Sequence, residues 1–370
     1  MGKGDGNISL SAVDIRAWLE HAAATHPDRV ALEAEPARVT YAELHERAAR
    51  AARRLAASGI AVGDRVALML APGPEFVETL HGCLLLGAPA MPIDLRLAAG
   101  ERAAQAATAA LVVDAPLDGP ETGEVPLAAP HPADAVATVV HTSGTTGAPK
   151  PVELTYGNWA ASARGSAAGL GVGAGERWLC ALPLSHVGGL SIPIRSAMYG
   201  TTAVLHERFE ADRVAAALRD DGITLTSLVP TMLARLLDAG LERPPALRAA
   251  VMGGAPLPDE LCERAAAARV PLAQTYGLTE SCSQVTLSAI GEPQTAGRAL
   301  PGSTIELSPA GEILVGGATV APGSLAEDGL LHTGDLGEID EEDRLLVTGR
   351  AADTIVTGGE NVAPAEVEEA

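Results

Sequence analysis

The 370-residue sequence is long enough for two or three packed units, and its 47% hydrophobic but only 2% aromatic content indicates a core of mainly Ala, Val and Leu. The net charge of −21 argues against nucleic acid or an anionic membrane as the main partner, because both require a basic face. We expect no signal peptide and no membrane span, since no apolar stretch is long enough. The four cysteines have no metal-ligand or redox spacing, so we expect buried thiols in the cytoplasm: Cys83, Cys180, Cys262 and Cys282.

Helical and extended segments alternate through the first part of the chain. An amphipathic segment at 41–58 ends before Gly59, a candidate C-cap, and precedes an apolar strand at 66–70 and a helix near 75–86. Residues 98–135 predict a helix followed by a surface connection. This alternation favours a largely parallel sheet that is covered on both faces.

A loop rich in hydroxyl groups and glycine follows the β-branched strand at 135–140. Its glycines let backbone N–H groups approach an anion, while the hydroxyls and the lysine, the only one besides Lys3, add donors and positive charge. The segment after the loop is extended, so the loop lies between strands, unlike a P-loop, which a helix follows. The sequence predicts a phosphate-binding loop, with a plain surface turn as the alternative: Thr142, Ser143, Gly144, Thr145, Thr146, Gly147, Ala148, Pro149 and Lys150.

A second alternation of strands and helices occupies the middle of the chain. Its strands are expected near 178–182, 201–205, 224–228, 248–252 and 270–274. From about residue 285 the pattern changes to short strands and turns, including 303–307 and 311–315. The sequence thus predicts two α/β units followed by a smaller β unit.

Polar side chains follow two of these strands. Tyr276, Thr279 and Glu280 are expected at the carboxyl edge of the sheet, where open α/β sheets bind ligands. A tyrosine ring can stack on a base, a threonine can bond a phosphate oxygen, and a glutamate can hold the Mg²⁺ that accompanies ATP. An ordinary loop or strand-to-helix turn is the alternative for each segment. Small residues that would let a flat ring approach follow the neighbouring strand: Gly253, Gly254 and Ala255.

Three further side chains could take part in a site. Asp335 offers a carboxylate in a turn, suited to two vicinal ribose hydroxyls, and Arg350 could donate to the same ribose or to phosphate. An Asx-turn and a surface pair between Arg350 and Asp353 are the alternatives. His186 lies among small residues at a strand end, either as a functional group or as a structural histidine.

In their order along the whole chain, these elements resemble the acyl-adenylating superfamily of acyl-CoA synthetases, peptide-synthetase adenylation domains and firefly luciferase. Within it, the closer likeness is to the 2-succinylbenzoate–CoA ligases of menaquinone biosynthesis. The segments that carry this likeness are 154–159, 182–192 with Arg195, 276–284 and 358–362.

The resemblance implies an α/β fold with a large N-terminal adenylate-forming domain at 1–349. This domain would comprise α/β sheet subdomains at about 1–177 and 178–284, packed together, and a small distorted β-barrel subdomain at about 285–349. Residues 350–370 would be the hinge and the stub of a C-terminal domain.

The resemblance also implies a two-step ligase that uses ATP, Mg²⁺ and, as co-substrate, coenzyme A. A carboxylic acid would attack the α-phosphate of ATP, pyrophosphate would leave, and the CoA thiol would then displace AMP. We expect these small molecules as partners, with homo-oligomerisation left open. The catalytic residues implied are Lys150, Thr279, Glu280 and His186.

The nucleotide would lie along the segments named above. The loop from Thr142 to Lys150 would grip the β- and γ-phosphates, and Tyr276 would stack on adenine beside 253–255 and Gly277. Thr279 would contact the α-phosphate, Glu280 with Thr145 would hold Mg²⁺, and Asp335 with Arg350 would bind ribose.

Arg195 narrows the prediction of the acid substrate. It lies in an otherwise apolar segment, where a buried cation is costly unless an anion pairs with it. A second substrate carboxylate would supply that anion, whereas a fatty-acyl tunnel would not; a surface arginine is the alternative. The residues expected around the acid are His186, Ser191, Arg195, Gly277 and Ser283.

The sequence departs from the superfamily in three places. It ends where a mobile C-terminal domain carrying an adenylation lysine would begin, so we expect a truncated form with impaired catalysis. Ala352 occupies an expected polar hinge position, and Pro151 occupies a position where many relatives have glycine. A ligase for another aryl or fatty acid and a non-catalytic nucleotide- or acyl-binding protein remain alternatives.

Overall fold

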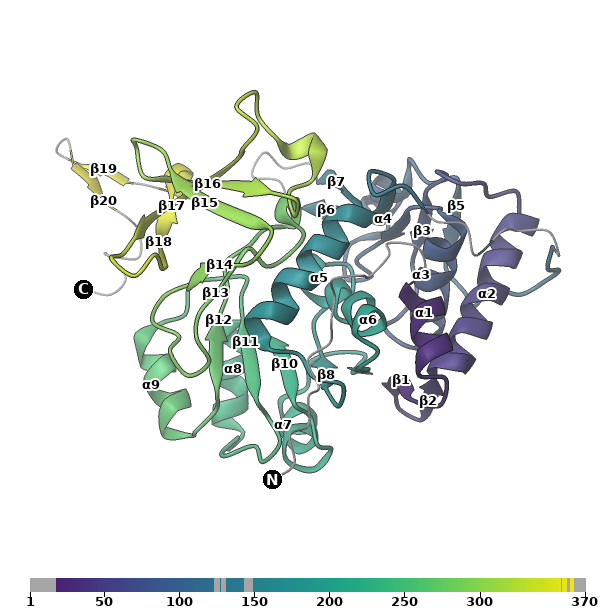
Figure 1. Cartoon of the computed structure of the whole chain (residues 1–370), viewed down its shortest axis with the longest axis horizontal. Coiled ribbons are helices and arrows are strands. Elements are labelled where there is room, and N and C mark those ends of the chain that lie inside the picture. The colour runs from purple at the N-terminus through teal and green to yellow at the C-terminus, as the bar shows by residue number, and fades with distance from the viewer. Residues whose placement is uncertain are drawn as a thin grey trace.

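Two sheets of mainly parallel strands form the body of the molecule (Figure 1). The structure is a computed structural model that describes residues 18–122, 127, 131–142, 149–353, 355–357 and 360–362. The larger sheet has seven strands in the order β12-β11-β10-β8-β9-β1-β2, with only β2 antiparallel to its neighbour. Its strands are β1 (Val30–Ala34), β2 (Ala37–Thr40), β8 (Arg177–Cys180), β9 (Thr202–Leu205), β10 (Leu225–Leu228), β11 (Ala249–Met252) and β12 (Leu272–Gln274).

The smaller sheet has five strands in the order β5-β3-β4-β6-β7. Its first four strands run parallel, and the last is antiparallel to its neighbour. These strands are β3 (Val66–Leu68), β4 (Ala90–Pro92), β5 (Leu111–Val113), β6 (Val136–Thr142) and β7 (Lys150–Thr155).

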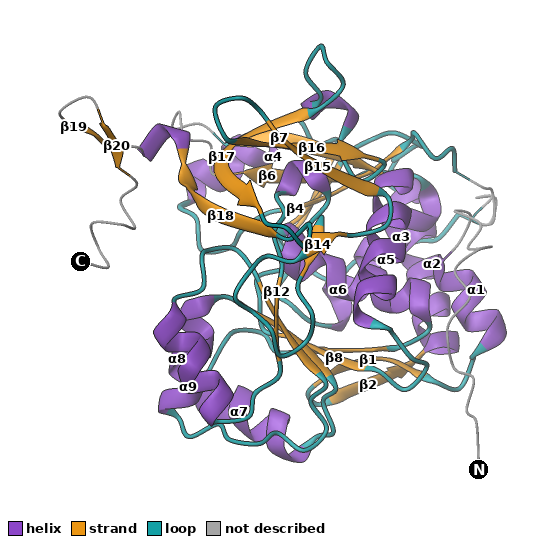
Figure 2. Ribbon diagram, turned by 60° about the vertical axis from the view of Figure 1, so that its left-hand side comes forward, coloured by secondary structure: helices purple, strands orange, loops and turns teal. Residues whose placement is uncertain are grey.

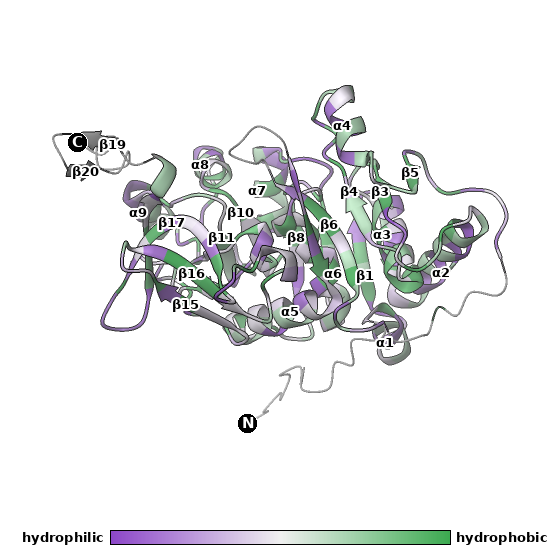
Figure 3. Ribbon diagram, turned by 90° about the horizontal axis from the view of Figure 1, so that it is seen from above, coloured by the Kyte–Doolittle hydropathy of each residue, from purple (hydrophilic) through white to green (hydrophobic). Residues whose placement is uncertain are grey.

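Helices cover both faces of the two sheets, and Figure 2 shows α5 and α6 between them. One large apolar cluster joins α1, α2, α3, α5 and α6 to the inner faces, while α7, α8 and α9 cover the outer face of the larger sheet and α4 covers that of the smaller. Figure 3 shows the corresponding hydrophobic strands, such as β1 and β6, inside the molecule. The helices are α1 (Trp18–Thr25), α2 (Tyr41–Ala57), α3 (Pro74–Leu86), α4 (Ala99–Ala106), α5 (Tyr156–Leu170), α6 (Val187–Tyr199), α7 (Ala211–Asp220), α8 (Pro230–Asp238) and α9 (Asp259–Ala267).

Side-chain caps fix where two of these helices begin. Thr40 accepts a hydrogen bond from the Glu43 amide, and the Glu43 carboxylate accepts one from the Thr40 amide (2.8 Å), which starts α2. Thr155 and Asn158 make the same reciprocal pair at the start of α5. Each pair satisfies amides that the first helical turn leaves without partners. Asn158 also donates to the carbonyls of Ala318 and Val320, so this cap ties α5 to the β unit.

A small antiparallel β unit follows the two sheets. Its main sheet has the order β15-β16-β17-β18, and an isolated bridge between Gly297 and Leu345 connects it to the β13–β14 pair. Within the described residues, no helix is both long and apolar enough to cross a membrane. The strands are β13 (Thr286–Leu287), β14 (Arg298–Ala299), β15 (Ser303–Leu307), β16 (Glu312–Gly317), β17 (Leu331–Ile339) and β18 (Leu345–Arg350). A separate two-stranded sheet follows, formed by β19 (Ile355–Thr357) and β20 (Glu360–Val362).

The expected α/β class and the expected strands of both alternations are present, with two differences. Strand β5 forms within 98–135, where only a helix and a connection were expected; it pairs with β3 at the edge of the smaller sheet. Strands β1 and β2 join the larger sheet through pairing of β1 with β9, so the sheets do not divide the chain at residue 178. Leu32, fully buried in β1, shows why this early segment belongs to the larger sheet's core.

Candidate functional site

The expected phosphate-binding loop closes a hairpin between β6 and β7. The two strands are antiparallel and pair up to Thr142 opposite Lys150, as expected for a loop between strands. The Thr142 hydroxyl lies 3.4 Å from the Lys150 carbonyl oxygen, to which it donates, and Lys150 is exposed. The rest of the predicted grip lies outside the described residues: Ser143, Gly144, Thr145, Thr146 and Gly147.

Three of the predicted nucleotide-binding side chains meet where β12 approaches the β unit. The hydroxyl of Tyr276 donates to Asp335 Oδ2 at 2.8 Å, and Arg350 Nε donates to Asp335 Oδ1 at 2.8 Å. Asp335 and Arg350 are directly opposite each other in the β17–β18 ladder. Burial holds the pKa of Tyr276 above its usual value, so the phenol remains a donor at neutral pH.

The glycines after β11 lie beside the end of β12. The Thr275 amide donates to the Met252 carbonyl at 2.8 Å, which brings the two strand ends together. Gly254 has φ +81°, a left-handed conformation that suits glycine, and a Cβ on Gly253 would lie 3.2 Å from Thr275. Both residues, like the exposed Ala255, leave open backbone next to the segment that carries Tyr276.

A tight loop from Tyr276 to Gln284 carries most of the remaining predicted residues. A Cβ on Gly277 would lie 1.6 Å from the Ser283 carbonyl oxygen, so only glycine fits this crossing. Cys282 and Ser283 have φ values of 54° and 85°, which non-glycine residues rarely adopt. Strained backbone of this kind is held by its surroundings, here by Ser162, which donates to the Cys282 carbonyl at 2.6 Å.

Replacing Gly277 with alanine is expected to destabilise the protein by about 1–3 kcal/mol, because the added methyl group forces the Ser283 carbonyl aside. Scanning calorimetry measures the change in Tm. The matched control is Gly100→Ala in α4, where a Cβ meets nothing within 4 Å and helix propensity favours alanine. Equal melting of the Gly277 variant and the wild type would contradict the close crossing.

Thr279 and Glu280 lie in a 3₁₀ turn, Thr279–Ser281, and are partly exposed. The Glu280 side chain has no hydrogen bond or ion pair with any other part of the chain that the structure describes. Nor do the described residues contain a cluster of three or more metal-ligating side chains. Glu280 offers a partly exposed carboxylate, and proteins commonly hold Mg²⁺ through one or two carboxylates together with substrate phosphates.

Arg195 is buried within α6 rather than lying on a helix surface. It is 1% exposed and donates to Gln284 Oε1 at 2.6 Å and to Ser162 Oγ at 2.7 Å. Desolvation lowers the pKa of its guanidinium group, and none of the described carboxylates forms an ion pair with it. Arg195 Nε and Gln284 Nε2 are buried donors with no acceptor among the described residues. Arg195 is therefore a buried cation whose partners among the described residues are neutral.

Ser191 and Ser283, also expected near the acid, are close in sequence to two members of this cluster, Arg195 and Gln284. Ser191 is buried in α6 and donates to the Gly188 carbonyl at 2.8 Å. Ser283 is partly exposed and precedes Gln284. Of the two, Ser283 is thus the more accessible to a ligand.

His186 is the N-cap residue of α6 and contacts a charged pair, Asp94 and Arg96, in the turn that follows β4. Arg96 donates to both oxygens of Asp94, and its Nη2 lies 3.1 Å from His186 Nε2. A guanidinium group can only donate, so Nε2 accepts and the proton of the neutral imidazole is on Nδ1. Although 58% of the His186 side chain is exposed, partial desolvation and the Arg96 charge lower its pKa, which agrees with a neutral ring.

Comparison with known proteins assigns the chain to a family. A family model described as AMP-binding enzyme matches residues 19–113 and 111–325. The chain belongs to the AMP-binding enzyme family. It is 37% identical to the 2-succinylbenzoate–CoA ligase of Bacillus subtilis (strain 168), over 95% of this chain and 81% of that protein.

Solved structures of this family superimpose on the chain. The O-succinylbenzoate coenzyme A synthetase of Bacillus subtilis in complex with ATP and magnesium ion has a TM-score of 0.89, with 36% identity over 96% of this chain and 83% of that one. Its complex with the acyl-adenylate intermediate also has a TM-score of 0.89, with 35% identity over 95% and 82% of the two chains. A fatty acyl CoA synthetase from Mycobacterium tuberculosis has a TM-score of 0.80 at 29% identity, over 95% and 81%.

Sequence reasoning missed several side chains that hold the site of this AMP-binding enzyme. Asp94 and Arg96 are about 90 residues from His186, and no local pattern links the two segments. Gln284 and Ser162 are ordinary polar residues in sequence, yet they bind the buried Arg195. The cost of burying an arginine was the one available signal that polar partners must surround it.

Replacing Arg96 with glutamine is expected to raise the pKa of His186. The change removes a positive charge that lowers this pKa and leaves the Asp94 carboxylate, which raises it. NMR titration of the His186 Cε1–H resonance measures the shift, and Arg219→Gln, at an exposed arginine in α7, is the control. An unchanged or lower pKa in the Arg96 variant would refute the contact.

Proposed function

We propose that this protein is an ATP-dependent 2-succinylbenzoate–CoA ligase that forms an acyl-adenylate and then an acyl-CoA thioester. The observation that carries the proposal is the Tyr276–Asp335–Arg350 junction at the end of β12, in a chain 37% identical to such a ligase. A carboxylate and a guanidinium beside an aromatic ring suit the ribose and base of an adenylate. A non-catalytic nucleotide-binding protein would use the same junction, so the identity to a ligase is what favours catalysis.

In the first step, a substrate carboxylate oxygen attacks the α-phosphorus of ATP, and the bond to pyrophosphate breaks. Lys150 and the loop before it neutralise the leaving pyrophosphate, while Thr279 donates to an α-phosphate oxygen. When bound, Mg²⁺ supplies further charge neutralisation at the phosphates, and Glu280 is the side chain that would hold it. Tyr276, Gly253, Gly254 and Ala255 form the adenine site, and Asp335 with Arg350 holds the ribose.

In the second step, the CoA thiol, as thiolate, attacks the acyl carbon, and the bond to AMP breaks. His186 lines the passage to the acyl group as a neutral imidazole, because Arg96 uses its Nε2 as an acceptor. The enzyme's contribution to both steps is positioning of two reactants and stabilisation of developing charge. We place this chemistry in the cytoplasm, which fits four cysteines that are all free thiols.

The buried Arg195 cluster supports a substrate with a second carboxylate. Among the described residues, the Arg195 guanidinium group has neutral partners only. One donor of Arg195 and one of Gln284, Nε and Nε2, have no acceptor there. A substrate carboxylate would offset the cost of burying the guanidinium group. A ligase for fatty acids gains nothing from such a cation.

Acid-dependent ATP–pyrophosphate exchange tests the proposal. We expect exchange, even if slow, to be faster with 2-succinylbenzoate than with benzoate or decanoate, and mass spectrometry should detect the matching acyl-adenylate. Acid-independent AMP binding without exchange would favour a nucleotide-binding protein. Faster exchange with decanoate would favour a fatty-acid ligase.

A further inference from the structure

Asp335 lies in a β-bulge of β17 in which three residues oppose one. In the β16–β17 ladder, Glu312 lies opposite Leu336 and Leu314 opposite His332. Three residues of β17, Thr333 to Asp335, therefore face the single residue Ile313. Such a bulge re-aims side chains, but its extra amides lose their ladder partners and need others.

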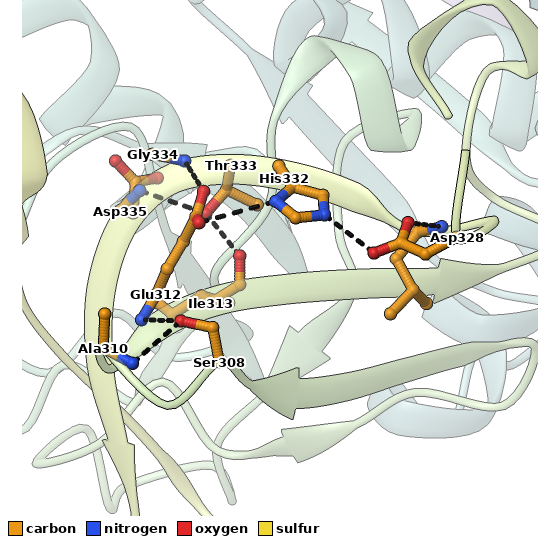
Figure 4. Close-up of polar contacts among 10 residues, drawn as sticks. Ser308, Ala310, Glu312, Ile313, Asp328, His332, Thr333, Gly334 and Asp335 are labelled. Atoms are coloured by element: carbon orange, nitrogen blue, oxygen red, sulfur yellow. Dashed lines mark hydrogen bonds and ion pairs between the residues drawn. The ribbon is translucent and has the colours of Figure 1, made fainter. Parts of the chain in front are cut away.

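Side chains supply those partners, as Figure 4 shows. The Thr333 hydroxyl donates to the Ile313 carbonyl at 2.7 Å and accepts from the Asp335 amide at 3.1 Å. The Gly334 amide donates to Glu312 Oε1 at 2.9 Å, and Gly334 has φ +71°. Glu312 thus holds the residue immediately before Asp335.

Glu312 is itself held from two sides (Figure 4). Ser308 Oγ accepts from the Glu312 amide at 3.1 Å, which fixes the turn into β16. On the other side, Glu312 Oε2 lies 3.5 Å from His332 Nδ1, and His332 Nε2 lies 2.9 Å from Asp328 Oδ2. The imidazole ring therefore bridges two carboxylates.

We propose that Glu312, steadied by Ser308 and His332, is a positioning residue that fixes the direction of the Asp335 carboxylate through the Gly334 amide. The inference rests on the proposed function, because the ribose role of Asp335 belongs to it. Glu312 does not touch the nucleotide; it acts by holding the bulge in one conformation. A residue that merely stabilises the fold would change the melting temperature but not the recognition of ribose hydroxyls.

Because His332 contacts Glu312, the positioning of Asp335 by Glu312 depends on pH. The hydrogen bond that His332 donates to the Asp328 carboxylate, together with the nearby Glu312 carboxylate, raises the pKa of His332 above its usual value. Its positive charge, and with it the attraction to Glu312, is present below that raised pKa and is lost as the pH rises through it. Asp328 and Glu312 are the charged groups that face the ring among the described residues. Ribose recognition should therefore weaken on the alkaline side.

The test compares binding of AMP with binding of 2′,3′-dideoxy-AMP by calorimetry on the full chain. We expect Glu312→Ala to reduce the preference for AMP at least fivefold while the Kd for the dideoxy nucleotide stays nearly constant. Glu312→Gln keeps an acceptor for the Gly334 amide and should restore most of the preference. The control is Glu306→Gln, which changes an exposed glutamate of β15 and should leave the preference unchanged.

The outcomes separate this inference from the proposed function. Full preference for AMP in Glu312→Ala, or equal weakening of both nucleotides, would overturn the positioning role alone. Equal binding of the two nucleotides by the wild type would instead overturn the ribose role of Asp335, and both proposals with it. Hydrogen exchange at the Gly334 amide should become faster in Glu312→Ala, and unchanged exchange would also overturn the inference.

Discussion

Replacing Asp335 with alanine is expected to raise the Kd for AMP about a hundredfold. The carboxylate is 9% exposed and is oriented by the Tyr276 hydroxyl and the Arg350 guanidinium group, both at 2.8 Å. Two charge-assisted hydrogen bonds to ribose hydroxyls contribute about 1.5–3 kcal/mol each, and about 2.7 kcal/mol already corresponds to a hundredfold change in Kd. Calorimetric titration with AMP measures it directly.

The control for this change is Glu338→Ala, an exposed carboxylate farther along β17. It removes the same charge from the same strand and should leave AMP binding nearly unchanged. A second variant, Asp335→Asn, keeps the shape of the side chain and should retain more affinity than alanine. Wild-type affinity for AMP in Asp335→Ala would show that the nucleotide does not bind at the β12 junction.

Local patterns predicted the elements that form from neighbouring residues. The helix at Tyr41–Ala57 has its capping residues within four positions, and the paired strands Val136–Thr142 and Lys150–Thr155 are a β-branched run and a second extended run close in sequence. The site segment at Tyr276 could be placed because it follows a recognisable strand, whereas Asp335 was expected in a turn and lies in a bulge of β17. Their order along the chain then pointed to an adenylate.

Contacts between distant segments could not be predicted in this way. Strand β1 joins the larger sheet by pairing with β9, about 170 residues later, and only tertiary packing decides that pairing. The contact of Arg96 with His186 has the same origin. Glu312 gave no signal either, because its role arises from a bulge whose size depends on the register of β16 with β17. The sequence was enough to predict the side chains that would contact the substrate. The structure was needed to identify the side chains that position them.

Arg195 was singled out by the sequence, and the structure adds its partners. The sequence suggested a cation in an apolar helix, and the structure places it in a buried cluster with neutral partners. Burying a charge without a counter-ion is costly, so a protein that retains such a group has either a polar network or a ligand to compensate. The two explanations differ in what happens when the charge is removed.

Replacing Arg195 with methionine is expected to reduce selectivity for 2-succinylbenzoate over 4-oxo-4-phenylbutanoate, which lacks the ring carboxylate, about a hundredfold. Methionine retains much of the volume but removes the cation, so the loss of one charge-assisted pair, about 3 kcal/mol, falls on the dicarboxylate alone. The ratio of kcat/KM values in acid-dependent pyrophosphate exchange measures the selectivity. Affinity for ATP should change less than this selectivity, because Arg195 holds the Tyr276–Gln284 loop only at its far end and contacts none of Tyr276, Asp335 and Arg350.

Stability needs its own measurement, since the variant leaves Gln284 Oε1 and Ser162 Oγ with one donor fewer, at a cost of about 1–3 kcal/mol. Scanning calorimetry gives this cost, and Arg195→Lys, which keeps the charge, should retain more of the selectivity than methionine. A methionine variant that is destabilised but still prefers the dicarboxylate would make Arg195 a structural cation, stabilised by Gln284 and Ser162. The second carboxylate would then have to bind elsewhere, because this helix would offer it no other charge.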